Sequence, residues 1–265
     1  MNLDTETDCL LSIVTIHKGN ETNLEFTLNS LTHLGLLSQF SELILVNANP
    51  NHYGFNGENF ARFEQFINVD SGIFNAMNFG LTQCKGKYVV FVNSGDAVSS
   101  KVNEYLIKTQ LESDSKWFVA KSTRRDYLNG WKEDWFLPTS YLKFYFAVNS
   151  YCHQSTFVRR KVLCEMGGFR EDNSVADWEV SLILHRIQKP SVVDTYWANF
   201  AGLGVSDFPN MKLWCRDVSN SRIRNGIHVV GCSPLDFGLQ KLISIALRFK
   251  NYKKNKLRLK AVGSC

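Results

Sequence analysis

The segment from residue 70 to residue 96 constrains the fold more than any other part of the chain. Within it, apolar residues recur at the spacing of one buried helix face: Ile73, Ala76, Met77, Gly80 and Leu81. A break at residues 85–87 follows, and Tyr88 to Val92 is an almost continuously apolar run, typical of a strand covered on both faces. Asp96 comes just past the carboxyl end of that strand. In open α/β sheets ligands bind beyond the carboxyl ends of strands, so Asp96 is predicted to belong to a site.

The same alternation of strand and helix runs through the first 190 residues. Further buried strands are predicted at Leu10 to Ile16, Leu43 to Val46, Phe66 to Val69 and Trp117 to Lys121. Helices are predicted at residues 24–34, 101–112, 161–166 and 177–187. This succession of β-α-β units predicts an α/β fold with a mostly parallel central sheet. Right-handed crossovers then bring the ends of the first, second and fourth strands to the same rim.

Two blocks of sequence together resemble family 2 glycosyltransferases. The first is Asp70-Ser-Gly-Ile-Phe-Asn-Ala-Met-Asn-Phe-Gly80, continued by Lys87-Tyr-Val-Val-Phe-Val-Asn-Ser-Gly-Asp96. The second is His153-Gln-Ser-Thr-Phe-Val-Arg-Arg160, followed by Gly167-Gly-Phe169 and Ala176-Asp-Trp-Glu179. In particular, the chain is similar to the small bacterial enzymes that build O-antigen, capsule and colanic-acid polysaccharides. The resemblance covers residues 10–200 and does not extend to the C-terminal tail.

This resemblance implies a GT-A fold, the Rossmann-like fold of nucleotide-diphospho-sugar transferases, in residues 1–230, with a basic tail at 231–265. It implies an inverting transfer of one hexose or N-acetylhexosamine from a nucleotide sugar to an oligosaccharide acceptor, expected to be lipid-linked, in the synthesis of a lipopolysaccharide or another surface polysaccharide. The Q-x-x-R-W element of the family's processive synthases is absent, which favours a single addition over polymerisation.

Asp96 aligns with the last acid of the family's metal-binding D-x-D element, so the resemblance assigns it to Mg²⁺ or Mn²⁺. Here the element reads Ser94-Gly95-Asp96, and its first acid is missing. Mg²⁺ typically takes one or two protein carboxylates and fills its other positions with water and phosphate. The structural alternative is that Asp96 caps the next helix.

Asp177 corresponds to the acid that takes the acceptor's proton in the resembling family. A carboxylate near a helix N-terminus is stabilised as the anion, which suits a base. Glu179 is the competing acid, although two residues further on it points elsewhere around a helix. The structural alternative for Asp177 is a simple N-cap.

The resemblance also assigns residues to the substrates. Those assigned to the nucleotide sugar are Thr15, His17, Asn47, Asp70, Asn75, Asn78, Ser94 and Gly95. Those assigned to the acceptor or the diphosphate are His153, Gln154 and Arg159. Many family members have an aspartate where this chain has Asn47, whose amide both donates and accepts. The resemblance favours a UDP-sugar as the donor, and the change from aspartate to Asn47 leaves a GDP-sugar as the alternative.

Composition favours a cytosolic protein. Its seven cysteines are an odd number without a C-x-x-C pair, which favours reduced thiols over a disulfide framework or a zinc site. Residues 2–9 are polar and acidic, so no signal peptide is expected. No apolar run approaches the length of a membrane span.

The positive charge is concentrated near the C-terminus. Residues 241–260 hold eight Lys or Arg and no acid, so the remainder of the chain, whose total is +5, sums to −3. Before and within this stretch Leu235, Leu239, Leu242, Ala246 and Phe249 keep helical spacing. This pattern favours a basic amphipathic helix at the inner face of the cytoplasmic membrane. The alternatives are a solvated helix packed on the body and a nucleic-acid patch; no nucleic acid is expected as a partner.

Two other functions fit parts of the pattern. A non-catalytic relative would bind nucleotide or glycan without turnover, which Asn47 and the thinned metal element allow. A nucleotidyltransferase would share the α/β layout, but the glycine-rich phosphate loop expected near the first strand is missing.

Overall fold

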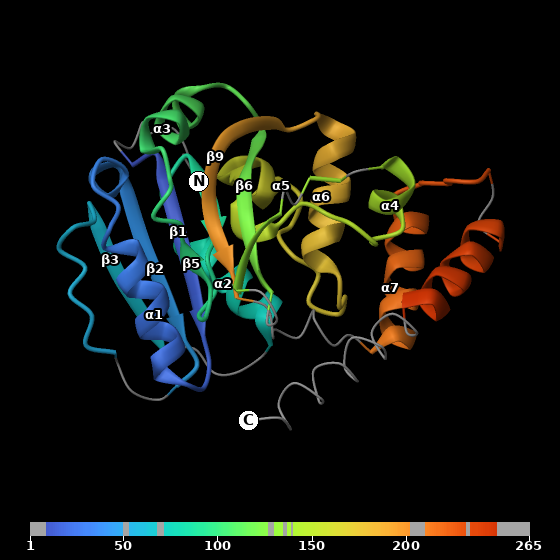
Figure 1. Cartoon of the computed structure of the whole chain (residues 1–265), viewed down its shortest axis with the longest axis horizontal. Coiled ribbons are helices and arrows are strands. Elements are labelled where there is room, and N and C mark those ends of the chain that lie inside the picture. Colours follow the sequence, from blue (N-terminus) through green and yellow to red (C-terminus); the bar gives the residue numbers. More distant parts are fainter. Residues whose placement is uncertain are drawn as a thin grey trace.

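The computed structural model describes residues 9–49, 53–67, 72–126, 130–134, 137–138, 140–201, 210–231 and 234–247. Strands and helices alternate through the first part of the chain, as Figure 1 shows. These elements are β1 (Leu11–His17), α1 (Glu21–Leu31), the 3₁₀ turn η1 (Leu37–Phe40), β2 (Ser41–Asn47), β3 (Arg62–Ile67), α2 (Ile73–Gln83) and β4 (Tyr88–Phe91).

The second part of the chain is less regular. It contains β5 (Ala97–Val98), α3 (Glu104–Glu112), β6 (Trp117–Asp126), β7 (Gly130–Asp134), α4 (Tyr141–Tyr145), the 3₁₀ turn η2 (His153–Ser155), β8 (Thr156–Arg159), α5 (Arg160–Glu165), α6 (Ala176–Ile187), β9 (Ser191–Phe200) and α7 (Met211–Arg224). A further helix covers residues 234–247.

Within the described residues the strands form one sheet in the order β3-β2-β1-β4-β8-β6-β9-β5, with β7 paired to β6. The pairs β3–β2, β2–β1, β1–β4 and β6–β9 are parallel. The short strands β8, β5 and β7 pair antiparallel with their neighbours. The predicted α/β class with its parallel core is confirmed, and the antiparallel strands are additions that the sequence patterns did not predict.

An apolar layer lies on each face of the sheet, because successive residues of a strand point to opposite faces. On one face Leu11 and Ile13 of β1 join residues of α1 and α3. On the other face Val14 and Ile16 join residues of α2, α5 and α6. The helix and strand predicted at 73–92 therefore lie in the centre of the fold.

Helix α6 is buried on two sides. Val180 and Leu184 face the sheet, whereas Trp178 and Leu182 belong to a separate cluster with α4 and α7. Helix 234–247 adds Ile243 and Leu247 to the edge of that cluster. The boundary expected at residue 231 remains a prediction, and residues 248–265 of the expected tail lie outside the described residues. None of the helices described is long and apolar enough to cross a membrane.

Candidate active site

The turn that follows β4 carries Asp96. Gly95 has a φ of +100°, a conformation that costs glycine little and strains residues with a Cβ. Its N–H points to α1, 3.2 Å from the carbonyl oxygen of Asn23 and 2.9 Å from Oγ1 of Thr27. The Thr27 hydroxyl in turn donates to the carbonyl oxygen of Asp96 at 2.6 Å. Helix α1 therefore fixes the backbone that presents Asp96.

The carboxylate of Asp96 is buried and accepts hydrogen bonds from two other elements of the fold. Gln154 Nε2 donates to its Oδ2 at 2.7 Å, and the N–H of Ala201 donates to its Oδ1 at 3.0 Å. No group of three or more metal-binding side chains occurs among the residues that the structure describes. Carboxylate oxygens keep further lone pairs, so one aspartate fits an ion that takes most of its ligands from a diphosphate and water. It does not fit a dedicated protein cage.

Asp177 lies in the first turn of α6 and is partly exposed. The N-cap of this helix is Val175, so Asp177 is not the N-cap. Oδ2 of Asp177 lies 3.3 Å from Nδ1 of His153. Burial by itself raises the pKa of Asp177, but the hydrogen bond from His153, together with the backbone N–H groups of Asp177 and Trp178, outweighs it and the net pKa is lowered. The carboxylate is therefore held as the anion that a general base requires.

Glu179, the competing acid, has a structural role. It is buried, accepts from Asn173 Nδ2 at 2.6 Å, and pairs with Arg224 Nη2 of α7 at 3.0 Å. It thus faces α7 and not His153, as the rotation between two positions of a helix requires.

The other nitrogen of His153 is also engaged. Asn93 Nδ2 lies 3.3 Å from its Nε2. A neutral imidazole with its proton on Nδ1 satisfies both neighbours, donating to Asp177 and accepting from Asn93; this tautomer is assigned from the partners. Oδ1 of Asn93 is buried and has no hydrogen-bond partner among the described residues.

Two consecutive residues therefore hold both candidate acids. His153 and Gln154 belong to the short turn η2, which lies against β4, β6 and β9. One contacts Asp177 and the other Asp96. The structure brings these four predicted site residues together at one end of the sheet.

The ends of β1 and β2 form the neighbouring part of this edge. His17 and Asn47 stand side by side in the parallel register. Nδ1 of His17 lies 2.9 Å from Oγ of Ser94, and its Nε2 lies 3.2 Å from Nδ2 of Asn49. Burial lowers the pKa of His17 and keeps the imidazole neutral. Thr15 is fully buried, and its Oγ1 has no hydrogen-bond partner in the described part of the chain.

Two predicted site residues lie elsewhere. Arg159 stands opposite Tyr88, at the start of β4, and donates to Asp114 at 2.8 Å. Because β8 runs antiparallel to β4, its four residues carry Arg159 away from Asp96. Asn78 gives its amide to the main chain of Phe169, with Nδ2 at 2.7 Å from the oxygen and Oδ1 at 2.8 Å from the nitrogen. The structure thus uses Asn78 to fasten α2 to the turn before α6.

Two more assignments remain predictions. Asn75 is half-buried on α2, and Asp70 lies outside the described residues. The residues that the sequence patterns missed are Asn93, Asn49 and Thr27. Asn93 belongs to the same Asn-Ser-Gly-Asp run as Asp96, so the motif could have identified it. Thr27 gives no signal in the sequence, because its role depends on helix packing.

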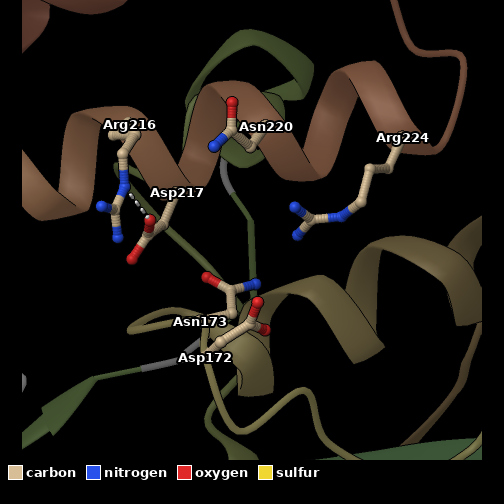
Figure 2. Close-up of a pocket in the computed structure, with 6 residues that line it drawn as sticks. All are labelled: Asp172, Asn173, Arg216, Asp217, Asn220 and Arg224. Atoms are coloured by element: carbon tan, nitrogen blue, oxygen red, sulfur yellow. Dashed lines mark hydrogen bonds and ion pairs between the residues drawn. The ribbon is translucent and has the colours of Figure 1, made fainter.

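A pocket of about 330 Å³ lies beside α6 and not between the two acids. Figure 2 shows its lining residues on α7 and on the loop before α6: Asp172, Asn173, Arg216, Asp217, Asn220 and Arg224. Oδ2 of Asp217 accepts from the N–H and the hydroxyl of Ser174, at 3.0 and 2.7 Å. Burial raises the pKa of Asp217, but Arg216 and Ser174 outweigh it and lower the pKa. The hydrogen bonds of Asp217 therefore hold the loop before α6 against α7, and this loop leads directly to Asp177.

No family model matches the sequence, and no curated protein matches it. Solved structures do match the fold. TarS 1–349 from S. aureus, in complex with UDP-GlcNAc, aligns with a TM-score of 0.60 at 15% identity, over 80% of this chain and 65% of that one. The mannosyltransferase PcManGT from Pyrobaculum calidifontis, in complex with GDP-Man and Mn²⁺, aligns with a TM-score of 0.57 at 12% identity, over 96% of this chain and 79% of that one.

These likenesses establish the fold. The chain spans less than two thirds of the TarS chains, 65% of the 1–349 fragment and 40% of the longer structure. The predicted Rossmann-like α/β architecture is therefore confirmed, while activity and substrates are matters for proposal.

Proposed function

We propose that this protein is an inverting glycosyltransferase that moves one hexose or N-acetylhexosamine from a nucleotide-diphospho-sugar to an oligosaccharide acceptor. The observation that carries the proposal is the pairing of His153 with Asp177 and of Gln154 with Asp96, at distances of 3.3 and 2.7 Å. Adjacent residues thereby keep a charged base and a phosphate-side carboxylate at the same edge of the sheet.

The donor is a nucleotide sugar held at the ends of β1 and β2. His17, Asn47 and Ser94 lie at this edge, where ligands of open α/β sheets bind. Similar folds were solved with UDP-GlcNAc and with GDP-Man, which supports this class of donor. A UDP-sugar is the first choice, and the amide of Asn47 keeps a GDP-sugar as the second.

Asp96 is the residue that would hold Mg²⁺ or Mn²⁺ together with the donor's two phosphates. The Mn²⁺ in the mannosyltransferase complex supports a divalent ion for this fold. When bound, such an ion would neutralise the negative charge that develops on the departing diphosphate.

Asp177 accepts the proton of the acceptor's hydroxyl group. The freed oxygen forms a bond to the anomeric carbon from the side opposite the diphosphate, and the bond between that carbon and the phosphate oxygen breaks. Its electron pair leaves with the nucleoside diphosphate, so the configuration at the anomeric carbon inverts. His153 keeps the carboxylate ionised and oriented through its Nδ1.

The setting of this reaction follows from the sequence resemblance. We infer a lipid-linked acceptor, synthesis of a bacterial surface polysaccharide such as O-antigen, and a cytoplasmic location at the inner face of the membrane. No described residue contradicts this setting.

The direct test is donor turnover with water as acceptor. UDP-GlcNAc or GDP-Man is incubated with the protein and Mn²⁺, and the released nucleotide and the first-formed sugar anomer are followed by NMR. We expect an α-linked donor to yield the β-anomer, and Asp177→Asn to lower turnover about 10²- to 10⁴-fold, the range for a lost general base. Asp114→Asn, at an exposed acid between α3 and β6 that pairs with Arg159, is the matched control. Binding of both donors without turnover would establish the non-catalytic alternative instead.

A further inference from the structure

Helix 234–247 buries polar residues where a helix of a soluble domain normally buries apolar ones. Asp236, Gln240 and Ser244, spaced four residues apart, are all buried. Leu235, Leu242 and Ile245 share a different face and are 61, 65 and 49% exposed. Ile243 and Leu247 touch the cluster of α4, α6 and α7 and Leu239 is half-buried, whereas the three exposed apolar side chains face outward.

Specific bonds hold the helix in this orientation. The Asp236 carboxylate accepts from the N–H groups of Val229 and Val230, each at 2.8 Å. Gln240 Nε2 lies 3.5 Å from the carbonyl oxygen of Phe146. Rolling the helix to bury its leucines would break these bonds and leave buried polar groups without partners, which destabilises the fold.

Arg222 reinforces the same contact from α7. Its guanidinium is buried, stacks 4.1 Å from the centre of the Phe146 ring, and reaches the carbonyl oxygen of Asp236 at 3.5 Å. The polar side of helix 234–247 is therefore the side that belongs to the body. The outward apolar face requires another explanation, because contiguous exposed apolar surface usually marks an interaction site.

We propose that this outward face, formed by Leu235, Leu242 and Ile245, docks on the surface of an anionic lipid bilayer. Charge decides between the candidate occupants. Residues 241–260 carry eight Lys or Arg and no acid, whereas the rest of the chain sums to −3. Lys241 lies on this helix, and the other seven basic residues follow it in the sequence. Lipid headgroups of opposite charge attract such a stretch, whereas a second copy of the chain would repel it. This surface does not depend on the proposed transfer reaction.

Co-sedimentation of the full chain with vesicles tests the proposal. We expect binding to vesicles of phosphatidylcholine with phosphatidylglycerol and at least tenfold weaker binding to phosphatidylcholine alone. The variant Leu235→Ser/Leu242→Ser/Ile245→Ser should bind the anionic vesicles at least tenfold more weakly than the unchanged chain. The matched control replaces three exposed apolar residues of α3 and β9, Tyr105→Ser/Leu106→Ser/Val192→Ser, and should bind like the unchanged chain.

All substituted side chains are exposed, so thermal melting should show that both variants fold. Equal binding by the two triple variants, or no binding by the full chain, would overturn the proposal. A dimer in sedimentation velocity that the helix variant alone dissociates would assign the face to a second copy and would also overturn it. Donor turnover that stays unchanged in the helix variant would separate this surface from the transfer site.

Discussion

His153 places its Nδ1 3.3 Å from Oδ2 of Asp177, while its Nε2 accepts from Asn93. The imidazole thus connects the helix that carries the candidate base to the turn that follows β4. Since Gln154 contacts Asp96 from the same short turn, a shift of η2 would disturb both acids at once. The chemistry proposed for this edge therefore depends on two neighbouring residues that are not themselves acids.

Replacing His153 should move the acid limb of the pH profile of donor hydrolysis to higher pH. The folded pKa of Asp177 is lowered, so the base stays ionised down to below the ordinary aspartate value near 4. In His153→Ala only the backbone N–H groups of Asp177 and Trp178 still oppose the burial that raises this pKa, so the limb of the donor hydrolysis rate should shift to higher pH. His33→Ala, at an exposed histidine of another surface, should leave the profile unchanged. A limb that does not move in His153→Ala would show that Asp177 is not the titrating base.

The same interaction should appear in stability. A carboxylate with a lowered folded pKa stabilises the fold above its unfolded pKa, and that contribution is lost as the pH falls through the folded value. Urea unfolding between pH 6 and pH 3 should therefore show a shallower loss of stability in His153→Ala than in the unchanged chain.

Two substitutions of Gln154 should lower the stability of the fold by different amounts. In Gln154→Ala the buried carboxylate of Asp96 loses the hydrogen bond from Gln154, which should cost about 1–3 kcal/mol in the free energy of unfolding. Gln154→Glu places a second carboxylate against Asp96 and should cost more, because like charges oppose ionisation of both. Urea denaturation at pH 7 measures the order. Equal stability of the two variants would contradict the contact.

Glu179 should affect stability and not the chemistry. Glu179→Gln removes the charge that pairs with Arg224, which is partly exposed. The loss should be about 2 kcal/mol, below the 3–5 kcal/mol of a fully buried pair because solvent screens the arginine. Well below its melting temperature, the variant should keep the turnover of the unchanged chain. A loss of turnover comparable to that of Asp177→Asn would return Glu179 to the role of base.

The sequence predicted those helices and strands that local apolar periodicity determines. The helix at 73–83 and the strand at 88–91 follow from short-range patterns, and with them the position of Asp96 at a strand end. Asp177 and His153 were identified by resemblance, but their contact depends on packing between α6 and η2, which no local pattern encodes. The same holds for Thr27, whose hydroxyl fixes the turn of Asp96 from another helix.

Two predicted site residues lie away from the two acids, for reasons that the sequence does not reveal. Arg159 stands in the same motif as His153, yet the antiparallel direction of β8 separates them. Asn78 lies on a predicted helix, but its side-chain amide bonds to the main chain of Phe169. The preceding Gly168, with a φ of +71°, lets the backbone approach Asn78 closely. In helix 234–247 the apolar stripe was visible in the sequence, whereas the side that packs is decided by the bonds of Asp236 and Gln240.

The central claim is that the two acids divide the work, Asp96 on the donor's phosphates and Asp177 on the acceptor's proton. Isothermal titration of UDP-GlcNAc and GDP-Man in the presence of Mn²⁺ tests it, with Asp96→Asn and Asp177→Asn compared side by side. We predict that Asp177→Asn keeps the donor affinity of the unchanged chain within about twofold and that Asp96→Asn loses at least about tenfold, or 1.4 kcal/mol. Equal donor affinity in Asp96→Asn and the unchanged chain would contradict the account.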